Sequence, residues 1–390
     1  MNRNNRYIVL FVTHTVRMGG ANQSMLRLML ELRDRYQIIP IVLMPKISSK
    51  VPKWNISVAC DQNNIQWYSC RYYWFMGKNR FKSVAKYLSN IFLYPHVIYK
   101  LWKLNVDLVH TNGSVIDIGA WISRFKRKPH VWHLREFGYE DFQLRPVLGH
   151  PFQKFLYRNG GDAFVAISKA VASKYSALIC DKKLELIYNG IQPPPVRCYS
   201  NHCNINVEFC ILGRVSIAKN QKEVINALDI LVNKRGIKNL HLTMIGEASS
   251  EYALEVIHQI EEKHLNDYVT LTGERNNVSE LLAQMDVGLM LSTSEAFGRV
   301  TIEYMMHNLA VIATDTGANP EIITNRYDGL IYRYGDVQML ANSMQELIET
   351  PHDLIKYAKR GQEKALSEFT SEKNSSSIFK LYNNVVEHYK

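Results

Sequence analysis

Two glutamates eight positions apart, Glu295 and Glu303, are the residues best suited to chemistry in this chain. The apolar run 287–292 before them is typical of a buried parallel strand, and the amphipathic run 300–307 predicts a helix. Glu295 is therefore expected at the carboxyl end of a strand, where open α/β sheets bind ligands, with Glu303 about one turn into the next helix. Amides at the start of that helix suit a phosphate, and a carboxylate suits a pair of neighbouring hydroxyls. The pattern favours a sugar nucleotide as ligand, although a solvated helix with two glutamates would also fit the pair alone.

Two cations follow another predicted strand of the same half. The run 208–212 reads as a strand that ends in Gly213-Arg214, and Lys219 lies five residues further on. A guanidinium forms paired hydrogen bonds with phosphate oxygens, and an ammonium adds a point charge. These two residues are expected to bind a diphosphate; an ordinary basic loop is the alternative.

A pair of glycines, Gly19 and Gly20, separates the first predicted strand from the first predicted helix. Glycines there let the backbone approach a ligand closely, although a Gly-Gly pair is also common in plain turns. The surrounding sequence is not G-x-G-x-x-G, so a nicotinamide-binding loop is not expected.

The elements that must position these residues alternate along the chain, strand then helix, in each half. A proline run at 193–195 separates the halves, and this alternation predicts a parallel α/β sheet in each. We therefore expect an α/β fold with a domain of residues 1–195, to which the terminal helix 371–390 returns, and a second domain of residues 196–370. The predicted strands are 7–13, 38–44, 106–111, 130–134, 163–167, 208–212, 240–245, 269–272, 287–292 and 310–314.

Taken in order, these motifs resemble the retaining glycosyltransferases of family 4, which have the GT-B fold of two facing Rossmann-like domains with an interdomain cleft. The resemblance covers nearly the whole chain. It is carried by 19–21, His133, Gly213-Arg214 with Lys219, 295–298 with Glu303, and 317–321.

The resemblance implies a role for each matching residue. Arg214 and Lys219 would hold the donor diphosphate and stabilise it as it leaves, with help from the backbone amides of Phe297, Gly298 and Arg299. Glu303 would bind the ribose, and Glu295 and His133 would orient the donor sugar, although a lone histidine near a strand is often structural. Arg275, which follows Thr272-Gly273, would stack on the base.

The same resemblance implies a nucleotide-diphosphate sugar as donor and a glycan or lipid-linked hydroxyl as acceptor, in capsule, O-antigen or exopolysaccharide assembly. The chain has no D-x-D motif, so we expect neither a metal nor another cofactor. The alternatives are a GT-B sugar-nucleotide epimerase and a non-catalytic, degenerate transferase that only binds.

Three positions depart from the family pattern. Ala296 stands where a glycine is usual, and Tyr304 and Met306 are bulkier than the usual small residues after the second glutamate. The two large side chains need extra room beneath the helix, and a nucleotide pocket of altered shape would follow if that room is not provided.

Charge is distributed unevenly along the chain. Residues 1–195 hold 28 Lys and Arg against 11 Asp and Glu, a net charge of +17, whereas the whole chain has +11. The densest segment, 71–103, has seven basic residues, no acidic residue and ten aromatics. Basic residues interleaved with aromatics suit an anionic membrane surface, although an ordinary basic helix pair would also fit. A nucleic-acid partner is not expected, because no nucleic-acid-binding motif accompanies the charge.

No apolar run reaches the ~18 residues of a transmembrane helix, and the apolar residues near the N-terminus read as a first strand rather than a signal peptide. The six cysteines form no C-x-x-C motif, and free thiols are expected even where Cys198, Cys203 and Cys210 cluster with His202. These features predict a cytoplasmic protein that attaches peripherally to the inner face of the membrane.

Overall fold

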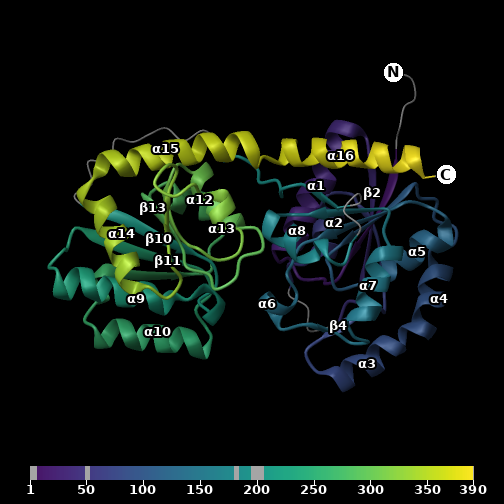
Figure 1. Ribbon diagram of the computed structural model, residues 1–390, viewed down its shortest axis with the longest axis horizontal. Helices are drawn as coiled ribbons and strands as arrows, with labels where there is room; N and C mark the ends of the chain where they lie inside the picture. The colour runs from purple at the N-terminus through teal and green to yellow at the C-terminus, as the bar shows by residue number, and fades with distance from the viewer. Residues whose placement is uncertain (1–6, 49–52, 180–183, 195–205, 390) are drawn as a thin grey trace. The chain divides into compact units, whose positions relative to one another are not determined.

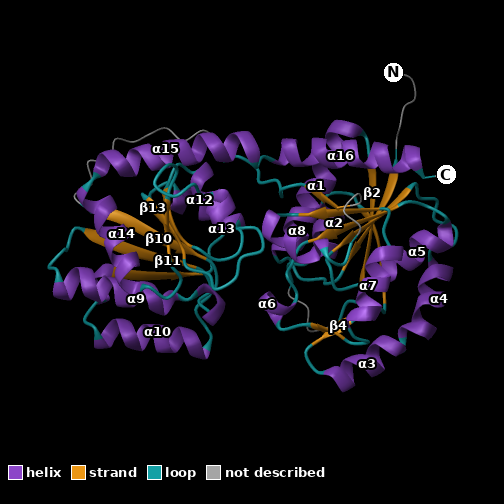
Figure 2. Ribbon diagram, in the orientation of Figure 1, coloured by secondary structure: helices purple, strands orange, loops and turns teal. Residues whose placement is uncertain are grey.

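The computed structural model describes residues 7–48, 53–179, 184–194 and 206–389. The chain divides into two compact units, the first formed by residues 1–190 with 371–390 and the second by residues 191–370. Each unit is an α/β fold with its own parallel sheet (Figures 1 and 2). No helix in the described ranges combines the length and the apolar composition that crossing a membrane requires.

The first unit is built on a parallel sheet whose seven described strands run in the order β3-β2-β1-β5-β6-β8-β9. Strands β1, β2 and β8 of this sheet are almost continuously apolar, because helices cover both of its faces. The strand bounds are β1 Ile8–Thr13, β2 Ile39–Pro45, β3 Gln66–Cys70, β5 Leu108–Asn112, β6 His130–Leu134, β8 Ala163–Ala166 and β9 Leu184–Leu186. A short antiparallel pair, β4 (Met76–Gly77) with β7 (Arg145–Pro146), lies outside this sheet.

The two faces of this sheet carry different helices. Helix α16 lies beside α1, where Phe379 stacks on Tyr36 with ring centroids 4.2 Å apart (Figure 1). Trp132 of β6 contacts Tyr157 of α7 on the opposite face. The helices are α1 Gly20–Tyr36, α2 Ile56–Gln62, α3 Arg80–Leu88, α4 Asn90–Lys100, α5 Ile118–Lys126, α6 Tyr139–Phe142, α7 His150–Asn159, α8 Lys169–Ser176 and α16 Ser371–His388.

The second unit has a parallel sheet whose six described strands run in the order β12-β11-β10-β13-β14-β15. Figure 2 shows α9 and α10 on one side of this sheet and α12 and α15 on the other. The strands are β10 Val207–Leu212, β11 Leu240–Ile245, β12 Val269–Gly273, β13 Val287–Met290, β14 Ala310–Thr314 and β15 Leu330–Tyr332. The helices are α9 Gln221–Asp229, α10 Glu251–Glu262, α11 Val278–Leu282, α12 Arg299–Met306, α13 Asn319–Ile322, α14 Val337–Glu349 and α15 Pro351–Glu368.

The strand order decides where each unit has a ligand crevice. In the second unit the chain starts at the central strand β10, builds outward through β11 and β12, and then returns to β13 on the other side of β10. Connections leave the carboxyl ends of β10 and β13 in opposite directions, and a crevice opens at such a switch point. The first unit has the equivalent point between β1 and β5.

The α/β fold class expected from the sequence is confirmed in both units. The apolar run near the N-terminus forms β1, and Ser168 caps α8 by accepting a hydrogen bond from the Val171 N–H at 3.0 Å. Helix α13 is only a single turn, because the backbone becomes extended at Ile323.

Candidate active site

At the switch point of the second unit, Lys219 and Glu295 form an ion pair, with 3.2 Å between Nζ and Oε2. Lys219 ends a short 3-10 turn after β10, and its ammonium also donates to Ser292 Oγ at 3.1 Å. The other oxygen of Glu295 accepts the Gly298 N–H at 3.1 Å. The loops after β10 and β13 thus meet through one lysine and one carboxylate, which is where the strand order places a crevice.

Gln221 stabilises the conformation of the loop after β10. Its side chain accepts the Ser216 N–H and donates to the Arg214 carbonyl, both at 3.1 Å. Gly213 has a φ of 134°, which favours glycine, and the Lys219 stem passes 3.6 Å from where a Cβ would stand. A Cβ at that distance would be in ordinary van der Waals contact, so the positive φ, and not the space beside Lys219, favours glycine here.

A third loop, after β14, supports Glu295 from behind. Gly317 has a φ of 58°, and a Cβ on it would stand 2.2 Å from the Glu295 carbonyl oxygen. The next amide, of Ala318, donates to that same carbonyl at 2.8 Å. Thr316 Oγ1 donates to the Ser292 carbonyl at 2.7 Å. Glu295 is thus fixed by backbone contacts from a neighbouring strand end, which is the arrangement a pre-organised site needs.

Helix α12 brings Glu303 to the same edge of the sheet. Glu303 Oε1 accepts from Arg299 Nε at 2.9 Å, one turn earlier on the helix. Gly298 precedes the helix with a φ of 77°, and a Cβ there would meet Ile322 at 2.6 Å. The N-terminus of α12 has no side-chain cap, and its partial positive charge lies beside the Lys219–Glu295 pair.

The other expected site residues of this unit lie in different settings. Arg214 pairs at the surface with Glu247, with 3.0 Å between Nε and Oε2, and its side chain is 67% exposed. Arg275 is exposed on the loop after the edge strand β12. The Phe297 ring is buried and lies edge-on to Phe369 at 6.3 Å, so this ring belongs to the core.

The bulky residues after the second glutamate are accommodated beneath α12. Tyr304 is fully buried, and its ring occupies the space that a side chain on Gly288 of β13 would fill, since a Cβ there would stand 2.3 Å from the ring. Its hydroxyl accepts the Leu212 N–H at 2.5 Å. Met306 is buried as well. Gly288 in β13 provides the space for the Tyr304 ring. The glycine is visible in the sequence, but the motifs that carry the family resemblance do not connect it to Tyr304.

In the first unit, Gly19 and Gly20 form the N-terminus of α1. Both are exposed, neither has a positive φ, and a Cβ on either would meet no atom within 4 Å. The fold therefore makes no steric demand for glycine here. Asn22 shapes the loop before them by donating to the Thr15 and Arg17 carbonyls at 2.8 and 2.9 Å.

His133 lies at the carboxyl end of β6 and is completely buried. Its Nδ1 is 3.1 Å from His110 Nε2 and 3.3 Å from an Arg135 nitrogen. Its Nε2 has no hydrogen-bond partner among the described residues. Burial, together with the positive charge of Arg135, holds the pKa of His110 and of His133 well below 6.5, so both rings are neutral.

The residue after Arg135 also has a structural partner. Glu136 Oε1 accepts the Ser114 N–H at 2.8 Å across the carboxyl ends of β5 and β6. Arg135 itself donates to Asn112 and to Asn189. These contacts order the loops around His133.

The basic and aromatic segment 71–103 is divided between core and surface. Tyr72, Phe75, Tyr87 and Tyr94 are buried, so these four aromatics belong to the core and are not available to a membrane. Tyr87 and Tyr94 each donate to the buried carboxylate of Asp117 at 2.6 Å, which attaches α3 and α4 to the start of α5. The exposed large apolar residues of α3, α4 and the turn after them are Phe81, Leu88, Ile91, Phe92, Tyr99 and Trp102.

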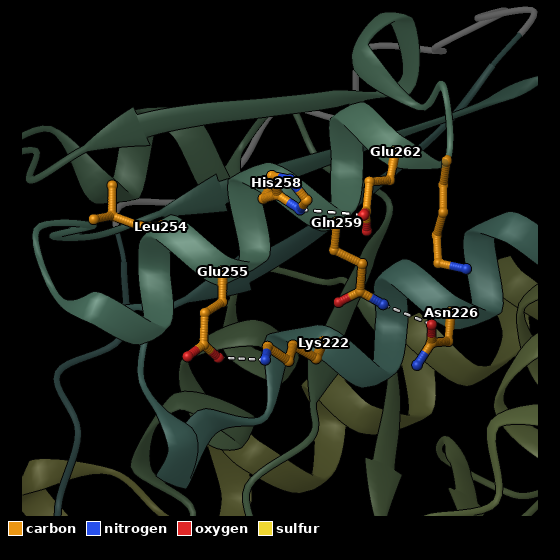
Figure 3. A pocket seen from close by; sticks show the side chains of 8 residues that line it. Lys222, Asn226, Leu254, Glu255, His258, Gln259 and Glu262 are labelled. Carbon is orange, nitrogen blue, oxygen red and sulfur yellow. Dashed lines mark hydrogen bonds and ion pairs between the residues drawn. The ribbon is translucent and has the colours of Figure 1, made fainter.

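A separate groove of about 790 Å³ lies between α9 and α10 (Figure 3). Its polar side chains pair with one another: Lys222 with Glu255, His258 with Glu262, and Gln259 with Asn226. None of the expected site residues lines it. We therefore place no ligand there.

Within the ranges that the structure describes, no three His, Cys, Asp or Glu side chains are grouped as metal ligands would be. Cys60, Cys70 and Cys210 are free and buried, and burial raises the pKa of the Cys60 thiol to about 12. Cys198, Cys203 and His202 lie outside the described residues.

Two Rossmann-like units, the second with cations and carboxylates at its switch point, are the architecture of the GT-B fold class. Two family models match the chain: Glycosyltransferase Family 4 over residues 18–193, and Glycosyl transferases group 1 over residues 206–364. The chain belongs to glycosyltransferase family 4.

The curated relatives are distant. The chain is 29% identical over 168 residues to the N-acetyl-alpha-D-glucosaminyl L-malate synthase of Bacillus anthracis, a match that spans 43% of each chain. It is 28% identical over 242 residues to the capsular polysaccharide biosynthesis glycosyltransferase CapH of Staphylococcus aureus, covering 60% of this chain and 67% of that one. The match spans less than half of the length of the first of these relatives.

Solved structures share the fold over nearly the whole chain. Anabaena HepE in complex with UDP superposes with a TM-score of 0.79 at 20% identity, covering 97% of this chain and all of that one. TarM has a TM-score of 0.73 at 13% identity, with 97% and 99% coverage.

Proposed function

We propose that the protein is a retaining glycosyltransferase that transfers a sugar from a nucleotide-diphosphate donor to an acceptor hydroxyl without a metal ion. The observation that carries this proposal is the meeting of Lys219 and Glu295 at the switch point of the second unit, beside the N-terminus of the helix that bears Glu303. Membership of the family, together with the binding of UDP by the similarly folded HepE, supports a nucleotide sugar as donor.

The cations at this edge suit a departing diphosphate. Lys219 is held beside Glu295 before any ligand arrives, and Arg214 lies on the same loop. Charge that develops on the leaving diphosphate would be stabilised by Lys219, which is already in place, and by Arg214 when it exchanges Glu247 for the ligand. Stabilisation by groups already in place is the main electrostatic route to a lower barrier. The same groups replace a metal ion in this proposal.

The two glutamates have separate tasks. Arg299 binds one oxygen of Glu303, and this contact directs the carboxylate and leaves its second oxygen for a ribose hydroxyl. Glu295 has one oxygen on Lys219 and the other on the Gly298 N–H, so the sugar must bind through the remaining lone pairs of a fixed carboxylate. Arg275, being exposed, is free of steric constraint for stacking on the base.

Retention of configuration requires attack on the same face of the donor sugar that the diphosphate leaves. A leaving phosphate oxygen would take the proton of the acceptor hydroxyl, so no protein base is needed. The neutral His133 is consistent with this scheme, because its role there is to donate a hydrogen bond to a sugar oxygen.

We further propose a lipid-linked or surface glycan as acceptor, reached from an anionic membrane surface. The exposed apolar side chains of α3 and α4 alternate with exposed lysines, Lys78, Lys82, Lys86, Lys100 and Lys103. Such a surface combines apolar insertion with attraction to anionic lipid. The relative CapH, which is named for capsular polysaccharide biosynthesis, supports this acceptor class.

One experiment tests the central proposal. Thermal unfolding is measured with a panel of nucleotide sugars, since a ligand present at 100 times its Kd adds about 2.7 kcal/mol to the stability. The stabilising donor is then incubated with candidate acceptors in excess chelator, and the anomeric configuration of the first-formed product is read by NMR. An inverted product or a strict metal requirement would refute the mechanism, and conversion of the donor sugar without acceptor would identify an epimerase instead.

A further inference from the structure

A chain of three buried side chains connects the last helix to the candidate histidine of the first unit. The Tyr382 hydroxyl of α16 lies 2.7 Å from His110 Nδ1, and His110 Nε2 lies 3.1 Å from His133 Nδ1. All three side chains are completely buried. Tyr382 and His110 are 272 residues apart in sequence and meet because α16 packs on the sheet face to which His110 points.

The sheet register explains how the two histidines meet. On the adjacent parallel strands β5 and β6, His110 pairs with Val131 and Asn112 pairs with His133. Residues two apart on a strand share a face, so His110 and His133 are diagonal neighbours on the same face. Their side chains are therefore close as a consequence of backbone pairing.

The direction of each hydrogen bond follows from Arg135. A guanidinium has donors and no acceptor, so His133 Nδ1, 3.3 Å from an Arg135 nitrogen, must be the acceptor. His110 Nε2 faces the same lone pair and must carry the proton that it shares with His133. The neutral His110 then has an unprotonated Nδ1, which accepts the Tyr382 hydroxyl proton.

With the hydrogen bonds in this direction, one donor remains at the His133 end of the row Tyr382–His110–His133. A neutral His133 with an unprotonated Nδ1 carries its proton on Nε2. That nitrogen is buried and has no partner among the described residues. An unpaired buried N–H costs free energy that an oxygen acceptor would recover, so a ligand oxygen that reached this nitrogen would be bound favourably.

We propose that Tyr382 and His110 are positioning residues which, together with Arg135, hold His133 in the Nε2–H tautomer, so that His133 serves the substrate sugar as a hydrogen-bond donor and not as a base. The tautomer follows from the contacts alone, whereas the sugar as its target rests on the proposed function. The last helix of the chain thereby has a role in catalysis in addition to packing.

The tautomer is tested first, in the protein without ligand. Long-range proton–nitrogen NMR spectra distinguish the two neutral forms of each imidazole, and His133→Gln and His110→Gln assign the signals. We expect both His110 and His133 as pure Nε2–H forms. An Nδ1–H form, a mixture, or a protonated His133 at neutral pH would overturn the proposal, whatever reaction the protein catalyses.

Kinetics then test the positioning. Tyr382→Phe removes only the hydroxyl that donates to His110. We expect kcat to fall about three- to tenfold, with the KM for the nucleotide sugar nearly unchanged. His110→Met, which removes the donor to His133, should lower kcat further, and His110→Gln, whose amide replaces the Nε2–H, should recover part of the loss.

The matched control is Tyr36→Phe, at the packing of α1 against α16, where the ring stacks on Phe379 and takes no part in the chain. It should retain full kcat. If Tyr382→Phe keeps both full kcat and the pure His110 tautomer, Tyr382 is a packing residue and the proposal is wrong. If the wild-type protein turns over no donor, the proposed function fails, while the NMR spectra still decide the hydrogen-bond chain.

Discussion

The hydroxyl of Tyr304 accepts the Leu212 N–H at 2.5 Å. Tyr304 follows Glu303 on α12, and Leu212 precedes Gly213 and Arg214 at the end of β10. One hydrogen bond thus connects helix α12, which carries the residue expected to bind ribose, to the end of β10. The loop expected to bind the diphosphate begins there. The relationship is possible because Gly288 leaves space for the ring.

The first prediction concerns this contact. Gly288→Ala should destabilise the second unit by about 1–3 kcal/mol, because the new methyl group overlaps the Tyr304 ring. Tyr304→Phe removes the acceptor of the Leu212 N–H and should cost about 1 kcal/mol. Urea unfolding measures both changes. In the double variant Gly288→Ala with Tyr304→Leu, the loss should be smaller than the sum of the losses measured for Gly288→Ala and Tyr304→Leu separately; strict additivity would show that the two sites do not interact.

The second prediction concerns the diphosphate cations. Lys219→Ala and Arg214→Ala should each lower turnover at least ~100-fold, as the loss of a pre-organised charge partner does. Steady-state kinetics with the identified donor measure the effect. Lys222→Ala is the control, since Lys222 lies on α9 and pairs with Glu255 in the separate groove. Unchanged turnover in Lys219→Ala would remove this lysine from the site.

The third prediction separates the two glutamates. Glu303→Gln should weaken donor binding by ~1.5–3 kcal/mol, the loss of a charged hydrogen bond, and Glu295→Gln should mainly lower kcat. Calorimetric titration with the nucleotide diphosphate and steady-state kinetics measure the two effects. Glu255→Gln serves as control because its carboxylate lies in the separate groove. Wild-type behaviour of both site variants would refute the assignment of these glutamates.

The fourth prediction concerns the α3–α4 surface. The protein should co-sediment with anionic vesicles and less with neutral ones, and salt should weaken the binding. Changing Lys78, Lys82 and Lys86 to Ser should reduce binding, and changing the exposed Phe81 and Phe92 to Ser should remove the part that resists salt.

A matched control for this surface changes Lys356 and Lys359 of α15, in the second unit, to Ser, and should leave binding intact. Binding that is absent at low salt, or equal for neutral and anionic vesicles, would contradict the proposed surface.

The fifth prediction concerns stability at mildly acidic pH. His110, His130 and His133 are buried, and burial lowers all three pKa values, to about 4 for His130. The unfolded chain binds protons near pH 6.5 and the folded chain does not, so stability is constant above pH 6.5 and falls as the pH decreases below it. At pH 5.5 each of these histidines should lower the free energy of unfolding by about 1.4 kcal/mol relative to its value at high pH.

Urea unfolding between pH 7.5 and 5.5 measures how the free energy of unfolding of the first unit changes with pH. His130→Gln should reduce this pH dependence by the contribution of one bound proton. A stability that is flat or rises as the pH falls to 5.5 would show that these histidines are charged in the folded protein.

The sequence alone determined the local features of this protein. Apolar runs identified β1, β10 and β13, because a parallel strand that is covered on both faces is predominantly apolar. The loop residues Lys219 and Glu295 followed from their places after such strands. Their types also limited the chemistry to cations for a diphosphate and carboxylates for hydroxyls.

Only the tertiary structure decided which of these residues meet. Lys219 pairs with Glu295 because the strand order places β10 beside β13, and that order depends on the packing of helices far apart in sequence. Burial of Tyr87 and Tyr94 on Asp117 likewise depends on how α3 and α4 fold onto α5, so composition could not separate core aromatics from surface ones. The contact of Tyr382 with His110 spans 272 residues and has no local signature, because it arises only when the last helix packs on the first sheet.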